Sequence, residues 1–546
     1  MKYNILFILT DQERYFAPRT LPQGYSLPGQ ERLRREGVSF INNQICSSVC
    51  SSARSVIYTG QHVPKTGVFD NLGYPWSQEL SPNIPTVATY LKGLGYYSAY
   101  YGKCHFNFQM KHPSSTGNLI DVNPDELRKV MKQYDFEDYF GIGDVIGLTE
   151  GGYQSDEFTT STAISWLRSQ RSQDKIDGKP WFLALNLVNP HDVMFFNTDP
   201  VGNSEQEKSA GSRINRDPNH KLYVKEWEMP LAESRNEPLE HPGRPSAHKE
   251  SKYSSAVVVG TFPSEDQRWK GLQDYYLNCM ADVDQHVDRI LKELDDLCLT
   301  ENTIVIMTSD HGELLGAHQM HGKGATAYKE QLNVPLYIRH PGYPDSANKQ
   351  CKALTSHLDI IPTILSMAGM TKAQFKQDAP KLKGHDISQL LASPETATIN
   401  QLRDSALYTF DMWSLIDAEY RQTQKENQND EKKMAPDLRK RGAIRSVTDG
   451  KYRYTRYFSP LIYKLPREMN DIYKLNDIEL FDLDSDPDEI NNLAATPEKG
   501  QQNKVKLIEM NHKLNKIIAE EIGEDNGDFL PDLKTLWTTK YSPIDI

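Results

Sequence analysis

The sequence lacks the features of a membrane protein and of a nucleic-acid-binding protein. No apolar run reaches the roughly 20 residues that a helix needs to cross a bilayer, so we expect no membrane-spanning segment. Basic residues are not in excess, because the formal charge of the 546-residue chain is -12 at pH 7. A phosphate backbone requires a basic face, so the charge argues against a nucleic-acid partner.

Cysteine is also scarce. Six cysteines are scattered over the long chain, which does not resemble the framework of a disulfide-stabilised protein. The apolar stretch 5–9 is too short for the core of a signal peptide with a cleavage site, and we interpret it as the first buried strand. The protein as given is therefore expected to be cytoplasmic, or periplasmic if an export signal has been removed.

Apolar runs alternate with amphipathic helical patterns over the first two thirds of the chain. This alternation is typical of an α/β fold with a mostly parallel sheet flanked by helices. The predicted buried strands are residues 3–9, 96–101, 181–188, 303–308 and 334–339. Residues 272–294 have apolar side chains at spacings of three and four, which predicts a helix. Cys279 lies on its apolar stripe and is interpreted as a core residue.

Two domains are expected from the length and from a change of pattern near residue 395. Residues 1–395 would form the catalytic α/β domain, in which the polar segment 197–268 reads as an insertion at the rim of the sheet. Residues 396–546 would form a smaller α+β domain with strands at 443–457 and 471–483 and a helix near 504–521. The polar tail 525–546 could pack on its own chain or on a neighbour, so a homo-oligomer stays open.

Polar side chains follow two of the predicted strands directly. Asp11 and Gln12 follow the first strand, and Asp310 and His311 follow the strand 303–308. Ligands bind at such strand ends in open α/β sheets. Carboxylates suit Ca²⁺, Mg²⁺ or Mn²⁺, and imidazole tolerates softer metals. Each pair taken alone fits a helix cap better than a metal site.

The segment 45–60 predicts a helix that starts at Ser51 and stops at Gly60. Cys50 would then lie at a helix N-terminus, where the helix dipole and free N–H groups favour an anion and lower a thiol pKa. Arg54, one turn further on, could reach the same anion.

Here the sequence resembles the sulfatase family, whose signature is Cys-x-Pro-x-Arg followed by Thr-Gly. The segment 50–54 and Thr59-Gly60 match it, although Ser52 replaces the proline. Further matches are the Gly-Lys-x-His of residues 102–105, Pro190-His191, the block 309–323 and the C-terminal signature 479–493. The resemblance covers nearly the whole chain and implies an alkaline-phosphatase-like fold.

The resemblance also implies the cofactors and the site residues. Asp11, Asp310, His311 and the oxidised Cys50 would bind a divalent cation, with Ca²⁺ as first choice and Mg²⁺, Mn²⁺ or Zn²⁺ as alternatives. Gln12 would be a ligand or lie just behind the ligands. A maturation enzyme would convert Cys50 to formylglycine, whose hydrate attacks the sulfur of a sulfate ester.

The remaining site residues receive roles from the same resemblance. Lys103, Lys323 and the helix N-terminus would neutralise the sulfuryl oxygens, while Arg54 would favour the alkoxide. His191 would protonate the leaving oxygen, and His105 would orient the nucleophile or accept its proton. For His318 and His321, a supporting role and a polar loop contact remain open.

Three alternatives remain at this point. Without conversion, Cys50 could attack as a thiolate. The chain could instead be a phosphonate monoester hydrolase or phosphodiesterase, since these enzymes share the fold and the motifs. It could also be an inactive anion-binding relative. The substrate would be a small-molecule or saccharide sulfate ester, and no motif identifies its alcohol.

Overall fold

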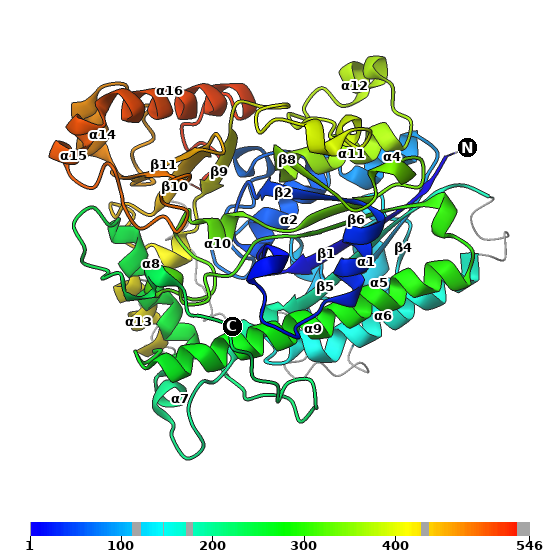
Figure 1. Ribbon diagram of the computed structural model, residues 1–546, viewed down its shortest axis with the longest axis horizontal. Helices are drawn as coiled ribbons and strands as arrows, with labels where there is room; N and C mark the ends of the chain where they lie inside the picture. The colour runs from blue at the N-terminus through cyan, green and yellow to red at the C-terminus, as the bar shows by residue number, and fades with distance from the viewer. Residues whose placement is uncertain (1, 112–121, 146, 171–177, 427–435, 532–546) are drawn as a thin grey trace.

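The computed structural model describes residues 2–111, 122–145, 147–170, 178–426 and 436–531. Within these ranges, eight strands form one sheet in the order β4-β3-β5-β1-β6-β7-β2-β8 (Figure 1). The strands are β1 (Asn4–Asp11), β2 (Val38–Gln44), β3 (Tyr97–Gly102), β4 (Asp138–Tyr139), β5 (Trp181–Pro190), β6 (Thr303–Ser309), β7 (Leu336–Arg339) and β8 (Lys349–Ser356). Only β7 runs antiparallel to its neighbours in this sheet. The mostly parallel α/β sheet is therefore confirmed.

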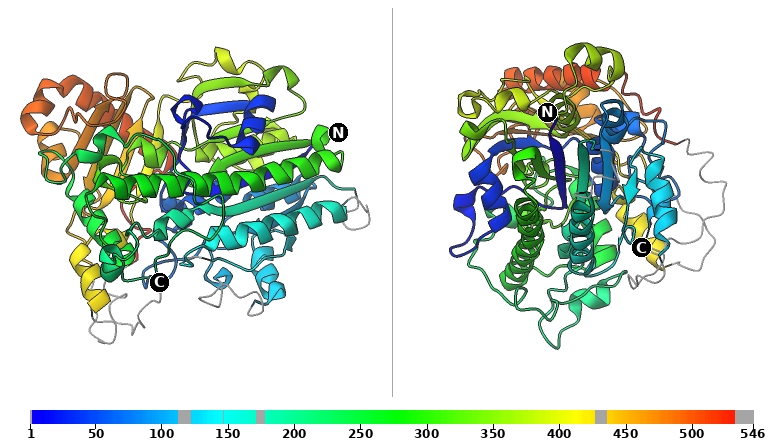
Figure 2. Two further views of the ribbon diagram at one scale, coloured as in Figure 1. Left: turned by 60° about the horizontal axis from the view of Figure 1, so that its bottom comes forward. Right: turned by 90° about the vertical axis from the view of Figure 1, so that its right-hand side faces the viewer.

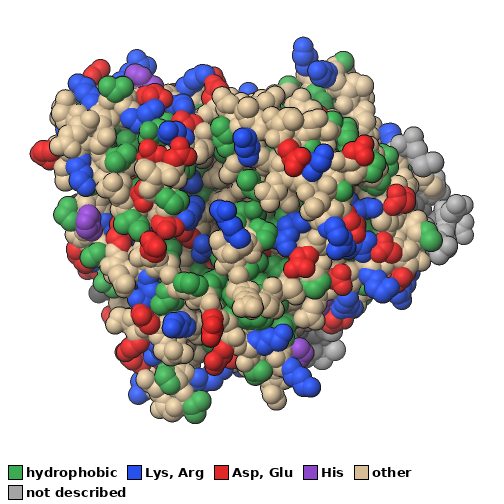
Figure 3. Space-filling model, viewed as in Figure 1, with side chains coloured by type: hydrophobic (Ala, Val, Ile, Leu, Met, Phe, Trp, Pro, Cys, Tyr) green, Lys and Arg blue, Asp and Glu red, His purple; other side chains and the backbone are tan. Residues whose placement is uncertain are grey.

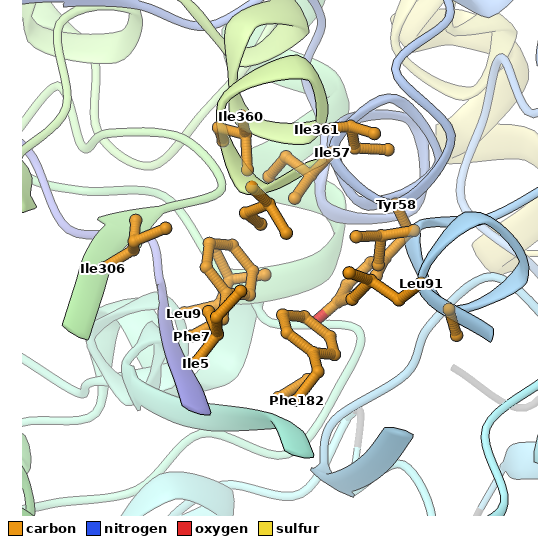
Figure 4. Packing of buried hydrophobic residues seen from close by; sticks show 14 of the residues in the cluster. Ile5, Phe7, Leu9, Ile57, Tyr58, Leu91, Phe182, Ile306, Ile360 and Ile361 are labelled. Atoms are coloured by element: carbon orange, nitrogen blue, oxygen red, sulfur yellow. The ribbon is translucent and has the colours of Figure 1, made fainter. Parts of the chain in front are cut away.

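Helices cover both faces of this sheet because its central strands are apolar on both sides. In β1, Ile5 and Phe7 belong to one buried cluster, and Leu6 and Ile8 belong to the other. The first face is covered by α2 (Cys50–Thr59), α4 (Val87–Gly93), α5 (Pro124–Lys132) and α11 (Ile360–Met367). The second is covered by α1 (Pro28–Glu36), α6 (Gly151–Gln170) and α9 (Asp266–Asp296). Figure 4 shows the first face, where Ile57 and Tyr58 of α2 meet the β1 side chains.

A second, antiparallel sheet lies at one end of the first (Figures 1 and 2). Its strands are β9 (Ala406–Phe410), β10 (Ala443–Thr448), β11 (Tyr452–Phe458) and β12 (Asp477–Asp482), in the order β12-β11-β10-β9. The helix α16 (Lys504–Glu521) packs its apolar side on this sheet through Leu507 and Leu514. The smaller α+β unit is thus present, while the domain boundary at residue 395 stays a prediction.

The structure corrects one expectation about elements and adds detail to two others. The segment 471–483 is not one strand, because its first half belongs to the helix α14 (Met469–Leu475). The polar segment 197–268 contains the 14-residue helix α8 (Ser246–Val259). The predicted helix 272–294 is confirmed inside the longer α9, where Cys279 is fully buried.

The face seen in Figure 3 carries acidic and basic side chains interspersed, without a continuous basic area. None of the described helices combines the length and the apolar character that crossing a membrane would need. The tail expected at 525–546 lies outside the described residues from 532 onward.

Candidate active site

The predicted site residues meet at the carboxyl ends of the central strands. Asp11 ends β1, Lys103 follows β3, His191 follows β5, and Asp310 follows β6. These four strands are adjacent and parallel, so their carboxyl ends lie at the same edge of the sheet. Residues about 300 positions apart in the sequence therefore come into contact. For example, the Gln12 N–H donates a 3.1 Å hydrogen bond to Asp310 Oδ1. The site therefore lies where open α/β sheets place their ligands.

Cys50 is the first residue of α2, one residue before the predicted start at Ser51, and so lies at a helix N-terminus as expected. The helix ends at Gly60, which adopts the left-handed conformation with φ of 64°. The thiol is buried, and its Sγ lies 3.2 Å from His311 Nε2, 3.1 Å from Lys323 Nζ and 3.5 Å from Asp11 Oδ1. Cys50 thus stands between a cluster of metal-ligating groups and a lysine.

The donors expected to bind the cation form a compact, buried cluster. Asp11, Cys50, Asp310 and His311 each offer a ligand atom, and these atoms all lie within 4.8 Å of one another. His311 Nδ1 lies 3.0 Å from the Gly312 carbonyl, which leaves Nε2 as the atom that faces the cluster. Two carboxylates and an imidazole that converge in this way fit a divalent cation.

Gln12 lies beside this cluster. Its Oε1 accepts a 2.7 Å hydrogen bond from Lys323 Nζ, and its Nε2 donates to Glu313. The side-chain amide is therefore oriented from both ends. A direct ligand role for Gln12 stays a prediction.

Three buried cations surround the carboxylates. Arg54 donates to Asp310 at 2.9 Å and to Asp11 at 3.1 Å, and Lys103 Nζ lies 2.5 Å from Asp11 Oδ2. Burial raises the pKa of Asp11, but the positive charges of Lys103, Lys323 and Arg54 together hold that pKa well below its usual value. Burial and the charge of Asp11 raise the pKa of Asp310 to about 6. Asp11 is thus ionised at neutral pH.

His105 and His191 are neutral in the free site. Burial, followed by the charge of Lys103, lowers the pKa of each well below the usual value. The backbone N–H groups of Cys104 and His105 donate to Asp144, which fixes the loop after β3. The Nδ1 atom of His105 is buried and has no hydrogen-bond partner among the described residues. Either histidine therefore gains a proton only when a negative charge enters the site.

One pocket reaches these groups from the surface. Gln12, Cys50, His105, His191 and Lys323 line it. Much of the remaining wall is apolar and includes Val49, Leu72, Phe195, Val258, Met412 and Leu415. The pocket can accept a molecule whose reacting group is anionic and whose remainder is apolar.

The structure separates the two histidines left open by the sequence. His318 Nδ1 lies 2.7 Å from Glu237 Oε2, and its ring stacks on Tyr328. His321 lines the pocket and packs against Phe262. His318 is therefore a structural contact, while His321 is part of the pocket wall.

Two supporting residues were not predicted from the sequence. Asn186 Oδ1 accepts from Tyr58 at 2.6 Å and lies 3.4 Å from Arg54 Nη1. Asp144 holds the loop of Lys103 and His105. Asn186 lies inside β5, and Asp144 lies in a loop next to β4. Neither residue belongs to a sequence motif, so no signal in the sequence pointed to them.

The sequence is similar to a known protein family and to its members. A family model described as Sulfatase matches residues 3–370. The chain is 24% identical over 396 residues to the uncharacterized sulfatase YidJ of Escherichia coli (strain K12), covering 68% of this chain and 69% of that protein.

Two solved structures share the fold. A 2-O GAG sulfatase aligns with a TM-score of 0.65 and 18% identity over 100% of this chain and 98% of its own. A phosphonate monoester hydrolase from Silicibacter pomeroyi aligns with a TM-score of 0.63 and 20% identity over 96% of each chain. The alkaline-phosphatase-like fold is thereby confirmed.

Proposed function

Since the chain belongs to the sulfatase family of the alkaline phosphatase superfamily, we propose that it hydrolyses a sulfate ester to an alcohol and sulfate, with residue 50 as the nucleophile. The observation that carries this proposal is the position of Cys50 Sγ. It lies at the N-terminus of α2, 3.1 Å from Lys323 Nζ and next to the Asp11–Asp310–His311 cluster, on the wall of an open pocket.

Residue 50 would act after conversion to formylglycine, whose hydrate would supply a hydroxyl that attacks sulfur. The bond from sulfur to the ester oxygen would break and release the alcohol, and the second hydroxyl of the hydrate would then expel sulfate as the aldehyde re-forms. Asp11, Asp310, His311 and residue 50 would hold the divalent cation, which would stabilise the negative charge that develops on that hydroxyl. Calcium is our first choice because the resemblance to the sulfatase family implies it. The carboxylate oxygens are hard ligands that suit Ca²⁺, and Mg²⁺, Mn²⁺ and Zn²⁺ remain alternatives.

The buried cations of the site bind and orient the sulfuryl group. Lys323 lies beside residue 50, and Lys103 contacts Oδ2 of Asp11, the carboxylate oxygen that does not face Cys50. The two ammonium groups would neutralise sulfuryl oxygens. Arg54 donates to both Asp11 and Asp310. It therefore keeps the two carboxylates in the ligating arrangement and ionised.

His191 would give a proton to the leaving oxygen. It lines the pocket and is neutral before the substrate binds, as its lowered pKa requires. The negative sulfate ester raises its proton affinity at the moment when a proton is needed. His105, whose Nδ1 has no hydrogen-bond partner among the described residues, would orient the hydroxyl nucleophile.

A second reaction, hydrolysis of a phosphonate monoester or phosphodiester, is the main competitor. The likeness to a phosphonate monoester hydrolase in the fold supports it. Sulfate monoesters and these phosphorus esters both present a single negative charge, so the cations of the site bind either. An inactive anion-binding relative would bind them without turnover.

Initial rates on matched esters decide among these reactions. The protein, co-expressed with a formylglycine-generating enzyme, is assayed with para-nitrophenyl sulfate, para-nitrophenyl phenylphosphonate and bis-para-nitrophenyl phosphate, before and after a chelator. We expect the highest kcat/KM on the sulfate ester, loss with the chelator, and recovery with Ca²⁺ or another divalent cation. The Cys50→Ala variant should be inactive and folded, while Cys298→Ala, at an exposed cysteine, should match wild type. A preference for phosphorus esters would overturn the proposal.

A further inference from the structure

The pocket wall contains a buried cation that the reaction above does not use. Arg421 of α13 (Ala418–Glu426) lines the same pocket as Cys50 and is 8% exposed. Its Nε atom has no hydrogen-bond partner, and its guanidinium makes no ion pair with any described residue. A buried N–H donor without a partner is costly unless a ligand supplies an acceptor.

The guanidinium of Arg421 packs against stacked aromatic rings. It lies over the ring of Tyr74, 5.3 Å from the centroid. Tyr74 stacks in parallel on Trp76, whose indole N–H donates to Asp70 at 2.8 Å. Asp70 also accepts from the backbone and hydroxyl of Ser414. This support orients the cation before a ligand arrives.

Nearby carboxylates are already engaged with other groups. Asp417 pairs with Lys440 at 2.7 Å, and Glu250 accepts from the Ala418 N–H and pairs with the same lysine. Neither acid forms an ion pair with Arg421 in the described part of the structure. The positive charge on the pocket wall remains uncompensated among the described residues.

A second unpartnered polar group lies on the neighbouring helix. The helices α8 and α13 pack against each other (Figure 1). Ser254 of α8 lines the pocket, and its buried Oγ has no hydrogen-bond partner among the described residues. A hydroxyl and a guanidinium can both donate to the oxygens of one acidic group.

Several apolar side chains line the same pocket as these groups and Cys50. Val258 and Val259 continue the pocket face of α8 one turn beyond Ser254, and Leu72, Met412 and Leu415 complete it. Such a wall binds a ring or another apolar body better than a strongly hydrated one.

We propose that Arg421 is a specificity-determining residue and that the substrate is a sulfate ester whose alcohol part combines an apolar ring with a second acidic group, a carboxylate or another sulfate. The sulfate ester lies at residue 50, the ring lies along the apolar wall, and the acidic group pairs with Arg421. This inference rests on the proposed function, since it describes the far end of the same substrate.

Matched acid and amide substrates test the inference. The first pair is para-sulfooxybenzoate and para-sulfooxybenzamide. The second pair is the sulfate ester of a hydroxynaphthoate and the sulfate ester of the corresponding hydroxynaphthamide. The second pair is longer, so its acid or amide group reaches further from residue 50. We expect wild type to prefer the acid of at least one pair. In Arg421→Met, kcat/KM for that acid should fall about 10- to 100-fold, mainly through KM, while the amide changes less than about twofold. Arg421→Lys should restore part of the preference, because it keeps the charge.

The control is Arg439→Met, at an exposed arginine that pairs with Asp437, which should behave as wild type. Equal kcat/KM for acid and amide in wild type, or an acid preference that survives Arg421→Met, would overturn the inference. If no ester is turned over, the proposed function fails. Calorimetric titration with the free hydroxy acids and hydroxy amides then still decides whether Arg421 binds the acidic group.

Discussion

Two cysteines four residues apart differ sharply in their surroundings. Cys46 is buried, and burial together with the charge of Glu521 raises its pKa to about 12, so it remains a thiol. Cys50 faces Lys323 and His311 instead and lies on the pocket wall. Only Cys50 is therefore placed for chemistry, which agrees with the spacing to Arg54 in the sequence.

Ser52 stands where the family signature has proline. It is the third residue of α2, and its backbone N–H is among the first N–H groups of a helix, which have no acceptor inside the helix. Its buried Oγ has no partner among the described residues either. Position 52 can therefore hold serine or proline without loss of a helix hydrogen bond, and with Ser52 the helix still begins at Cys50.

The His191→Ala variant tests the proposed proton donor. Removing a general acid matters most for poor leaving groups, so we expect a loss of roughly 100- to 10,000-fold for alkyl sulfates. For para-nitrophenyl sulfate, whose leaving group needs no proton, the loss should be about tenfold or less. Rates are measured over a series of leaving groups, with His241→Ala, at an exposed histidine, as the control. Equal losses across the series would remove His191 as the acid.

At the scale of single elements, α2 joins the core to the site. Ile57 and Tyr58 anchor it on the first sheet face, while its N-terminus presents Cys50 (Figure 4). Its end at Gly60 is fixed by the left-handed backbone there. The sequence predicted both ends, because small polar residues start the helix and glycine stops it.

Replacing the stop glycine tests this anchoring. In Gly60→Ala, the new Cβ would lie 2.6 Å from Leu382 Cδ2 and would sit on a left-handed backbone. We expect a loss of about 1–3 kcal/mol in the free energy of unfolding. Gly271→Ala, in α9 with nothing near the new Cβ, should instead gain about 0.5–1 kcal/mol. Denaturant titration measures both, and equal effects would contradict this interpretation of Gly60.

The elements that the sequence missed share a physical reason. The strands β2 and β8 contain polar residues such as Asn42 and Lys349, since they pair with each other at the edge of the sheet and need no continuous apolar run. In 471–483, Ile472 is buried by the packing of α14 rather than of a strand. Tertiary context decides such segments, and periodicity does not.

The same limit applies to the site. Asp11, Lys103, His191 and Asp310 were found because each follows a strand and belongs to a motif. Arg421 was not, because one arginine in a polar stretch carries no signal. It acquires meaning only when α13 packs on α8 and brings it to the pocket.

At the scale of the whole molecule, Glu479 connects the two sheets. It lies on β12 and accepts hydrogen bonds from Tyr457 of β11 at 2.6 Å and from Tyr328, in the segment between β6 and β7, at 2.8 Å. Burial raises its pKa to about 7, from 4.5 for an exposed glutamate, despite these hydrogen bonds. The folded protein thus retains a proton that the unfolded chain loses.

This proton makes stability fall as the pH rises from about 4.5 to about 7, since unfolding releases it in that range. The Glu479→Gln variant cannot release it. The free energy of unfolding should therefore fall less in the variant than in wild type when the pH is raised from 5 to 8. We expect the two decreases to differ by about 2–3 kcal/mol. Denaturant titrations at both pH values measure the difference, with Glu226→Gln, at an exposed carboxylate, as the control. Identical pH dependence in Glu479→Gln and wild type would contradict the role of Glu479.

The central claim is that residue 50 carries sulfate ester hydrolysis as formylglycine. Mass spectrometry of the proteolytic peptide that contains residue 50, from protein purified from its natural host, tests this claim most directly. The account predicts the mass of an aldehyde in place of the thiol, and trapping by a hydrazine reagent would identify that aldehyde. An intact thiol at residue 50 in all of the protein would contradict the account and leave a cysteine nucleophile or an inactive relative as the remaining choices.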